Sequence, residues 1–379
     1  MQSVLNIFTY YETWVVLIPF LVLLFAGCRF MGKGKWNDDV LSFDHTKSFL
    51  GFAAIWIILV HCSQKTSAYW LEPQYIKPGL ELFAQAGPVF VAAFFFCSGY
   101  GMYKSSKKGK SSFDHYFVKR FVPLLIPSVI TTLIIVILRM IMGMRIELAN
   151  PFGHGNPETL HPYIWYVIVL ILLYAMFYLC FKVIGSESTG ILAMIFLSCL
   201  LTLFFFAFSY NLVWFNTFPL FIVGILFAKN EKKVFAFSKK FYVPLVVVTP
   251  VAAVAGYFFS FYFWLISPDL QLPLTVLYPL NVLTAFTSVY FAFLAGLKIK
   301  IGNPVLSFLG KMTLEIYLVQ AIFINLFSYA FIDDGVRSLY YIKNVPLYVL
   351  VVLILTIASS FGLYKLDSMI RKKISKKNS

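Results

Sequence analysis

The sequence predicts an all-α protein, a polytopic transmembrane helical bundle of about eleven spans. Of its 379 residues, 60% are hydrophobic and only 12% are charged, whereas a soluble domain carries about 25% charged residues. Apolar runs of the length that crosses a bilayer as a helix recur along the whole chain. The predicted spans cover residues 13–29, 46–64, 84–103, 121–142, 163–182, 189–209, 213–228, 241–262, 273–296, 304–330 and 345–364.

The main membrane domain is expected over residues 44–365. The first span, 13–29, follows no basic segment and lacks a small-residue cleavage site, so we expect a retained extra helix and not a signal peptide. Together with a basic loop it forms the N-terminal segment 1–43. Residues 366–379 are expected to form a basic tail that fixes orientation and binds lipid headgroups.

Positive charge is concentrated on one side of the predicted topology. The net charge is +15, and 25 of the 31 Lys and Arg residues fall in alternate connections between the spans or in the C-terminal segment. Because such connections stay in the cytoplasm, they predict an N-terminus outside and a C-terminus inside a bacterial plasma membrane. The basic excess is therefore topological. It indicates membrane lipid as a partner and does not indicate nucleic acid.

The first candidate for chemistry is His61, which ends an almost wholly apolar run that starts at Phe49. A titratable side chain at the end of a membrane-length segment is costly and indicates a function, and histidine is well suited to proton transfer near neutral pH. The structural alternative is that His61 only marks the membrane interface. Lys47 lies about 21 Å away along the same predicted helix, so both can serve one reaction only if the substrate is long.

A second group of candidates lies at the predicted inner mouth of the bundle. Lys119 and Arg120 end a basic segment that begins at Lys104, and such side chains suit a phosphate-bearing ligand. The topology alone also accounts for these charges. Ser98, followed by Gly99, either permits close packing of two helices or lines the path of a ligand.

The predicted outer side carries a third group. Arg139, near the outer end of its span, either extends its guanidinium to the interface or contacts a substrate. His161, Trp165 and Tyr166 open the fifth span. They are typical of an interfacial aromatic belt, and they also suit a sugar acceptor.

Other polar residues are expected to be structural. Lys311 and Glu315 have the spacing of a helical ion pair, so we expect them to pair with each other. The five cysteines lie in or at the ends of apolar spans without a CxxC spacing, so neither a disulfide framework nor a metal site is expected. No P-loop or GxGxxG occurs, and we expect no permanently bound cofactor.

Six segments, in order, resemble the acyltransferase 3 family of membrane acyltransferases over most of residues 44–365. They are 49–63, which ends in the family's histidine, 94–103, with its Phe-rich Ser-Gly-Tyr signature, 116–127, a basic re-entry, 161–166, 218–229 and 308–320, with Phe-Leu-Gly-Lys and Tyr-Leu-Val. The resemblance implies ten family helices, which makes the first span an N-terminal addition.

The resemblance also implies an activity: an O-acyltransferase that takes an acyl group, usually acetyl, from cytoplasmic acyl-coenzyme A as co-substrate. It delivers this group to a hydroxyl of an extracytoplasmic or lipid-linked glycan. His61 would be the catalytic residue, either a general base or a transient acyl carrier. Acyl-coenzyme A would contact Lys47, Ser98, Lys119 and Arg120, the acceptor would contact His161, Trp165, Tyr166 and Arg139, and Lys311, Glu315, Tyr317 and Gln320 would support the site.

Three departures from the family pattern bear on the substrate. Leu50 stands where the family has a basic residue eleven positions before His61, with Lys47 one turn earlier as a substitute, and Gln320 stands where a histidine is common. The Glu that peptidoglycan-modifying members carry is missing after Trp165, which favours a polysaccharide or glycolipid acceptor. A transporter of a polysaccharide or lipid-linked intermediate is the alternative function, and a membrane scaffold is the third.

Overall fold

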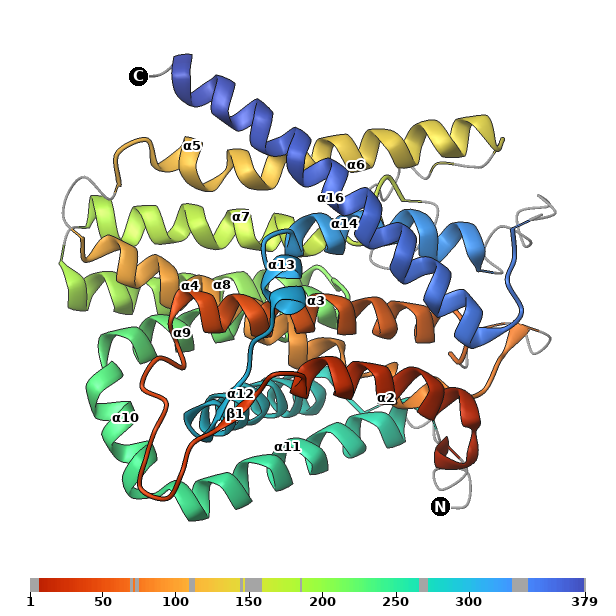
Figure 1. Ribbon diagram of the computed structural model, residues 1–379. Coiled ribbons are helices and arrows are strands. Elements are labelled where there is room, and N and C mark those ends of the chain that lie inside the picture. The colour runs from red at the N-terminus through yellow and green to blue at the C-terminus, as the bar shows by residue number, and fades with distance from the viewer. Residues whose placement is uncertain are drawn as a thin grey trace.

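A computed structural model describes residues 7–377 apart from the segments 69–70, 72–74, 109–112, 144–145, 147–158, 185, 266–271 and 329–339. It confirms an all-α polytopic bundle (Figure 1). Each predicted span contains an apolar helix. These helices are α2 (Tyr11–Phe25), α3 (Phe43–Gln64), α4 (Gly87–Ser106), α6 (Val122–Ile141), α7 (Trp165–Tyr178), α8 (Glu187–Ala207), α9 (Pro219–Lys229), α11 (Tyr242–Leu265), α12 (Leu274–Lys298), α14 (Thr313–Phe327) and α16 (Val345–Lys377).

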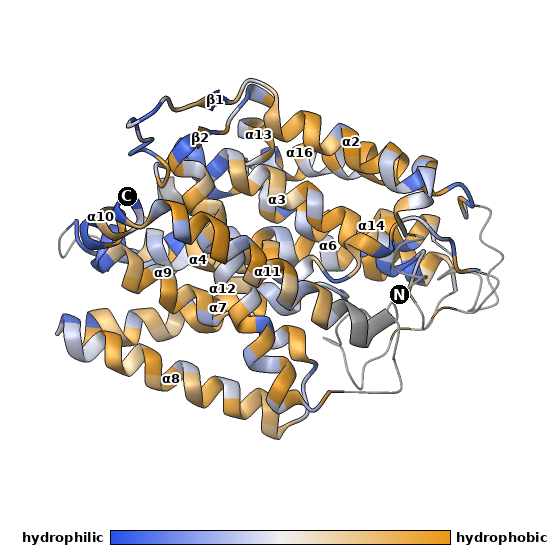
Figure 2. Ribbon diagram, turned by 90° about the horizontal axis from the view of Figure 1, so that it is seen from below, coloured by the Kyte–Doolittle hydropathy of each residue, from blue (hydrophilic) through white to orange (hydrophobic). Residues whose placement is uncertain are grey.

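Nine helical segments of the described chain are long and apolar enough to cross a bilayer. The other two, α2 and α14, are apolar helices of 15 residues. Large hydrophobic side chains cover the outer faces, for example Leu192 and Phe196 of α8 and Val243 and Val247 of α11. Figure 2 shows these apolar faces in orange and hydrophilic residues mainly at the helix ends. Such a surface suits lipid, so this is a multi-pass membrane protein.

Helix α3 lies deep inside the bundle, and nearly all of its residues from Gly51 to Ser63 are buried. It packs closely against α13 (Pro304–Leu309) because Gly51 has no side chain. A Cβ atom at Gly51 would lie 2.3 Å from the carbonyl oxygen of Leu306. The apolar run that predicted a span therefore forms the centre of the core rather than a lipid-facing helix.

Helices α4 and α9 make another close crossing. A Cβ atom at Gly99 would lie 1.9 Å from the carbonyl oxygen of Phe221, and one at Gly224 would lie 2.2 Å from that of Phe96. Small residues at such a crossing let two helix backbones meet without any loss of packing. Gly99 thus has the packing role that the sequence allowed, and it fixes the place of Ser98 beside it.

Short elements complete the fold. They are η1 (Ile7–Thr9), β1 (Arg29–Phe30), η3 (Glu81–Phe83), α5 (Tyr116–Arg120), η5 (Leu179–Val183), η6 (Leu212–Trp214), α10 (Glu231–Lys240) and β2 (Ile299–Lys300). We call the end of the bundle that contains α5, α10, and the first turns of α3 and α14 the lysine-rich end. It lies on the left in Figure 1. The last turns of α3 and α6 lie at the opposite end.

The C-terminal boundary differs from the sequence prediction. Helix α16 does not stop near residue 364 but continues as one helix to Lys377. An ion pair within this extension joins Arg371 to Asp367, whose side chain is buried, at 2.6 Å. The basic segment that was expected as a separate tail is therefore the end of the last membrane helix.

Candidate active site

His61 lies in the last turn of α3 and packs face to face against Tyr163. The two ring centroids are 3.9 Å apart and the ring planes differ by only 8°. Tyr317 of α14 is tilted against both rings, with centroids 6.2 Å from His61 and 6.1 Å from Tyr163. All three side chains are at least nine-tenths buried. Since aromatic contacts of this kind restrict ring orientation, the imidazole is held in one position.

Tyr163 is itself held in place by His161. Its backbone N–H donates to Nδ1 of His161 at 3.2 Å, which places the proton of a neutral imidazole on Nε2. His161 is almost fully buried, and burial lowers the pKa of its side chain to about 4. It is therefore neutral at pH 7. The sequence predicted that His161 contacts the acceptor. In the structure His161 bonds to Tyr163 and so supports the ring that stacks on His61.

A cavity of about 210 Å³ lies on the lysine-rich side of His61. Its wall on α3 is formed by Leu50, Ala54 and Ile57, a helical stripe that continues one turn later in His61. The other lining residues come from four further helices. They are Val91, Phe94 and Ser98 of α4, Leu124 of α6, Tyr166 and Leu170 of α7, and Thr313, Leu314 and Tyr317 of α14.

The cavity wall carries hydroxyl groups but no charged side chain. Hydroxyls come from Ser98, Thr313, Tyr166 and Tyr317, and Tyr317 packs against both His61 and Tyr166. The hydroxyl of Tyr317 is buried and has no hydrogen-bond partner among the described residues. A buried donor without a partner costs about 1–3 kcal/mol. A ligand in the cavity that accepts this hydrogen bond would recover that cost.

Cations lie one turn beyond the lysine-rich end of this cavity. Arg120 precedes Leu124 by one turn, and Lys47 precedes Leu50 by almost one turn. Lys311 lies two residues before Thr313 and is close enough to Lys47 for the two charges to repel each other. The cations that the sequence singled out therefore converge on the entrance of the cavity.

Lys47 does not occupy the position of the basic residue that Leu50 replaces. Its Nζ lies 4.3 Å from the centre of the Phe43 ring, on the lysine-rich side. The cavity residue at the family's basic position is Leu50, and Lys47 is not among the lining residues. Lys47 is thus placed to meet a ligand at the entrance but not inside the cavity.

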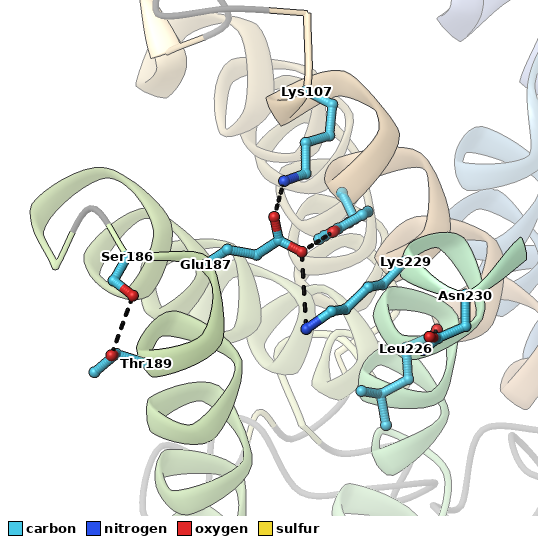
Figure 3. Close-up of polar contacts among 8 residues, drawn as sticks. Lys107, Ser186, Glu187, Thr189, Leu226, Lys229 and Asn230 are labelled. Carbon is cyan, nitrogen blue, oxygen red and sulfur yellow. Dashed lines mark hydrogen bonds and ion pairs between the residues drawn. The ribbon is translucent and has the colours of Figure 1, made fainter.

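Other lysines of this end are held by carboxylates. Figure 3 shows Glu187, at the start of α8, between Lys107, directly after α4, and Lys229 of α9. The hydroxyl of Tyr103 also donates to Glu187 at 2.6 Å, and Lys104 pairs with Glu231 at 2.6 Å. These contacts join the ends of four helices, α4, α8, α9 and α10, so they stabilise the entrance without providing free charge.

Lys119 and Arg120 differ from these paired lysines. Lys119 is exposed, and Arg120 donates from Nη2 to the hydroxyl of Ser105 at 3.1 Å. Within the part of the chain that the structure describes, neither forms an ion pair with a carboxylate. Both remain placed to meet a negatively charged ligand.

The predicted ion pair between Lys311 and Glu315 is wrong. Lys311 lies in the turn before α14, whereas Glu315 lies inside that helix, so the two do not share one helical face. Lys311 is exposed and Glu315 is buried, where its charge interacts with Asp367 and Arg371 of α16. Glu315 therefore lies where α14 packs against α16 and not beside Lys311.

Gln320 and Trp165, two further residues that the sequence singled out, are packed inside the bundle. Gln320 is fully buried, and its Nε2 donates to the carbonyl oxygen of Tyr317 one turn earlier at 2.9 Å. Trp165 packs against Trp214 of η6, with ring centroids 6.5 Å apart. Both stabilise the helices around His61 and neither lines the cavity.

A second, smaller pocket lies toward the opposite end. It has a volume of about 30 Å³ and lies between α6 and α14. Arg139, Pro162 and Asn325 line it, and Arg139 is only 4% exposed. The guanidinium is thus buried in the bundle and does not extend to the interface, which was one of the two expectations.

The fold and these two pockets define a membrane protein with a buried histidine between a larger and a smaller cavity, both lined mainly by apolar side chains, with Arg139 and Asn325 in the wall of the smaller one. The family model for the acyltransferase 3 domain, described as an acyltransferase domain, matches residues 51–365. The chain therefore belongs to the acyltransferase 3 family, and the predicted resemblance is confirmed. Membership makes the protein a membrane acyltransferase. No curated protein and no solved structure matches the sequence.

Proposed function

We propose that the protein is an O-acyltransferase that moves an acyl group, most simply acetyl, from cytoplasmic acyl-coenzyme A to a hydroxyl of an extracytoplasmic or lipid-linked glycan. The observation that carries the proposal is the cavity, which runs from a cationic entrance to the His61 stack. The lysine-rich end then faces the cytoplasm of a bacterial plasma membrane, in agreement with the positive-inside rule.

The cavity and its entrance suit the two parts of acyl-coenzyme A. Arg120, Lys119, Lys47 and Lys311 provide positive charge for the phosphates, which stay outside the bilayer. The pantetheine arm is neutral and fits a cavity without charged side chains. Leu50 and His61 are about 16 Å apart along α3, so a long, thin arm can bring its thioester to His61 while the nucleotide remains at the entrance.

The proposed transfer needs one base and one hydrogen-bond donor. His61 takes the proton of the acceptor hydroxyl as its oxygen attacks the thioester carbon. The C–O bond forms and the C–S bond breaks, and the leaving thiolate takes the proton from the imidazolium. The buried hydroxyl of Tyr317 is placed to donate to the thioester oxygen as negative charge develops on it.

The stack also constrains how His61 acts. Tyr163 covers one face of the imidazole, so the ring edge and its nitrogens are the parts left for proton transfer. A route in which His61 carries the acyl group covalently uses the same atoms. Trapping an acylated protein after brief incubation with labelled acetyl-coenzyme A, before acceptor is added, separates the two routes.

The function is tested by measuring ester-linked acyl groups on surface and lipid-linked glycans. Cells with the intact protein are compared with cells that carry His61→Ala at matched membrane expression. We expect the variant to lose a specific acyl ester, because a general base contributes about 10²–10⁴-fold to rate. His115→Ala, which removes an exposed histidine of the lysine-rich end, is the control and should keep the ester.

The opposite result has a clear meaning. Unchanged ester content in His61→Ala would remove the catalytic assignment. A change in the amount of surface glycan without a change in esters would favour a transporter.

A further inference from the structure

We propose that the pocket at Arg139 is an acceptor subsite that recognises an anionic group, the carboxylate of an acidic sugar or a phosphate. The inference deepens the proposed function and rests on it, because it names the class of acceptor.

Helices α6 and α14 line both pockets. On α14, Tyr317 faces the cavity, and Ala321 and Asn325 follow at intervals of four residues to face the smaller pocket. Residues at this spacing share one helical face. Asn325 lies about 12 Å beyond Tyr317 along the helix. One face of α14 therefore runs from the donor cavity, past the His61 stack, to the smaller pocket.

The chain segment before α7 also joins this pocket to the reaction centre. Pro162 lines the pocket, and the next residue, Tyr163, stacks on His61. A group bound in the pocket is thus only one residue away from the ring that positions the imidazole. An acceptor held there presents its neighbouring hydroxyl groups toward His61.

The polar groups of the pocket define the ligand chemistry. A guanidinium offers a rigid fork of donors that matches the oxygens of carboxylate and phosphate. An arginine placed inside a membrane bundle is costly and marks a functional site by default. Its side chain is 4% exposed and lies in the pocket wall.

Asn325 supplies the complementary group. Its Nδ2 donates to the carbonyl oxygen of Ala321 at 2.8 Å, while its Oδ1 is buried without a hydrogen-bond partner in the described part of the chain. An acceptor atom at this place suits a sugar hydroxyl. The pocket has room for one small polar group, so it holds the anion while the rest of the glycan lies outside it.

The test measures binding without turnover. The intact protein in lipid nanodiscs is heated with glucuronate, inorganic phosphate or glucose at equal ionic strength. We expect one or both anions to raise the unfolding temperature by about 2–4 °C near saturation, and glucose to have no effect. A rise with glucuronate alone identifies a sugar carboxylate, and a rise with phosphate alone identifies a phosphate-bearing acceptor.

Variants then locate the effect. Arg139→Gln should lose the shift and Arg139→Lys should keep part of it, because lysine retains the charge but not the fork. Lys343→Gln removes an exposed cation just before α16 and should retain the full shift. The proposal is overturned if neither anion stabilises the intact protein, or if Arg139→Lys and Arg139→Gln both respond like the intact protein. Because no acyl transfer is measured, failure here is distinct from failure of the proposed function.

Discussion

The lysine-rich end and the His61 centre use polar side chains in opposite ways. At the lysine-rich end, Lys104 and Lys107 meet carboxylates from other helices and remain partly exposed. At the centre, His61, Tyr163 and Tyr317 are packed against one another and are buried. Exposed ion pairs contribute about 0–1 kcal/mol each, so the first region tolerates change. In the second region, small displacements of a ring would alter the position of the atoms that we propose to react.

The largest effect on the rate of acyl transfer is expected at Tyr163. Replacement by leucine removes the ring that covers the His61 imidazole, and misplacement of a catalytic group by about 1 Å can cost about 10²-fold in rate. We expect kcat of Tyr163→Leu to fall by about 10–100-fold with little change in KM for acetyl-coenzyme A. Steady-state kinetics of acyl transfer measures both.

Tyr163→Phe is the control for this change because it keeps the stacked ring. It should retain most of the activity. A Phe variant as inactive as the Leu variant would assign the effect to the hydroxyl group and not to the stack.

A smaller effect is expected at the entrance, where paired and unpaired cations can be compared. Arg120→Gln should raise KM for acetyl-coenzyme A by about 5–10-fold, since it removes a charge-assisted contact to phosphate. High salt should reduce the difference. Lys104→Gln removes a cation that Glu231 already holds, and it should change KM by less than about twofold. Equal effects of both substitutions would mean that only the total charge of this end matters.

The smallest effect at neutral pH is expected for His161, which supports the stack without lining the cavity. Burial holds the pKa of folded His161 at about 4, below its ordinary value of 6.5. Below pH 6.5 the unfolded state binds a proton that the folded state does not. Its contribution to stability is therefore complete above pH 6.5 and is lost as the pH falls toward 4.

His161→Gln removes this titration. The unfolding temperature of the intact protein should fall more steeply between about pH 6.5 and 4 than that of the variant. Parallel curves for the two proteins would show that His161 takes up no proton on unfolding.

The sequence was sufficient for the fold because hydropathy marks each span by length. It also singled out His61 as a candidate, since a titratable residue stands out in an apolar run. The sequence did not identify Tyr163 and Asn325 as site residues. An aromatic residue at a span boundary and an amide within a span are common, so neither stands out. Their places beside His61 and in the smaller pocket come from contacts between distant segments.

The error at Lys311 and Glu315 has a local physical cause. A spacing of four residues predicts a pair only when both residues belong to one helix. The chain turns between α13 and α14, at residues 310–312. The pattern of apolar residues did not reveal this turn, because Phe308 and Leu309 continue the hydrophobic run into the next helix.

We propose that an acyl group passes from the lysine-rich end to an acceptor on the other side through the His61 site. The most direct measurement uses oriented membrane vesicles from glycan-producing cells and radiolabelled acetyl-coenzyme A added outside. Inside-out vesicles, which expose the lysine-rich end, should transfer label to glycan, whereas right-side-out vesicles and inside-out vesicles with His61→Ala should not. Equal labelling from both sides, or labelling that survives His61→Ala, would contradict this account.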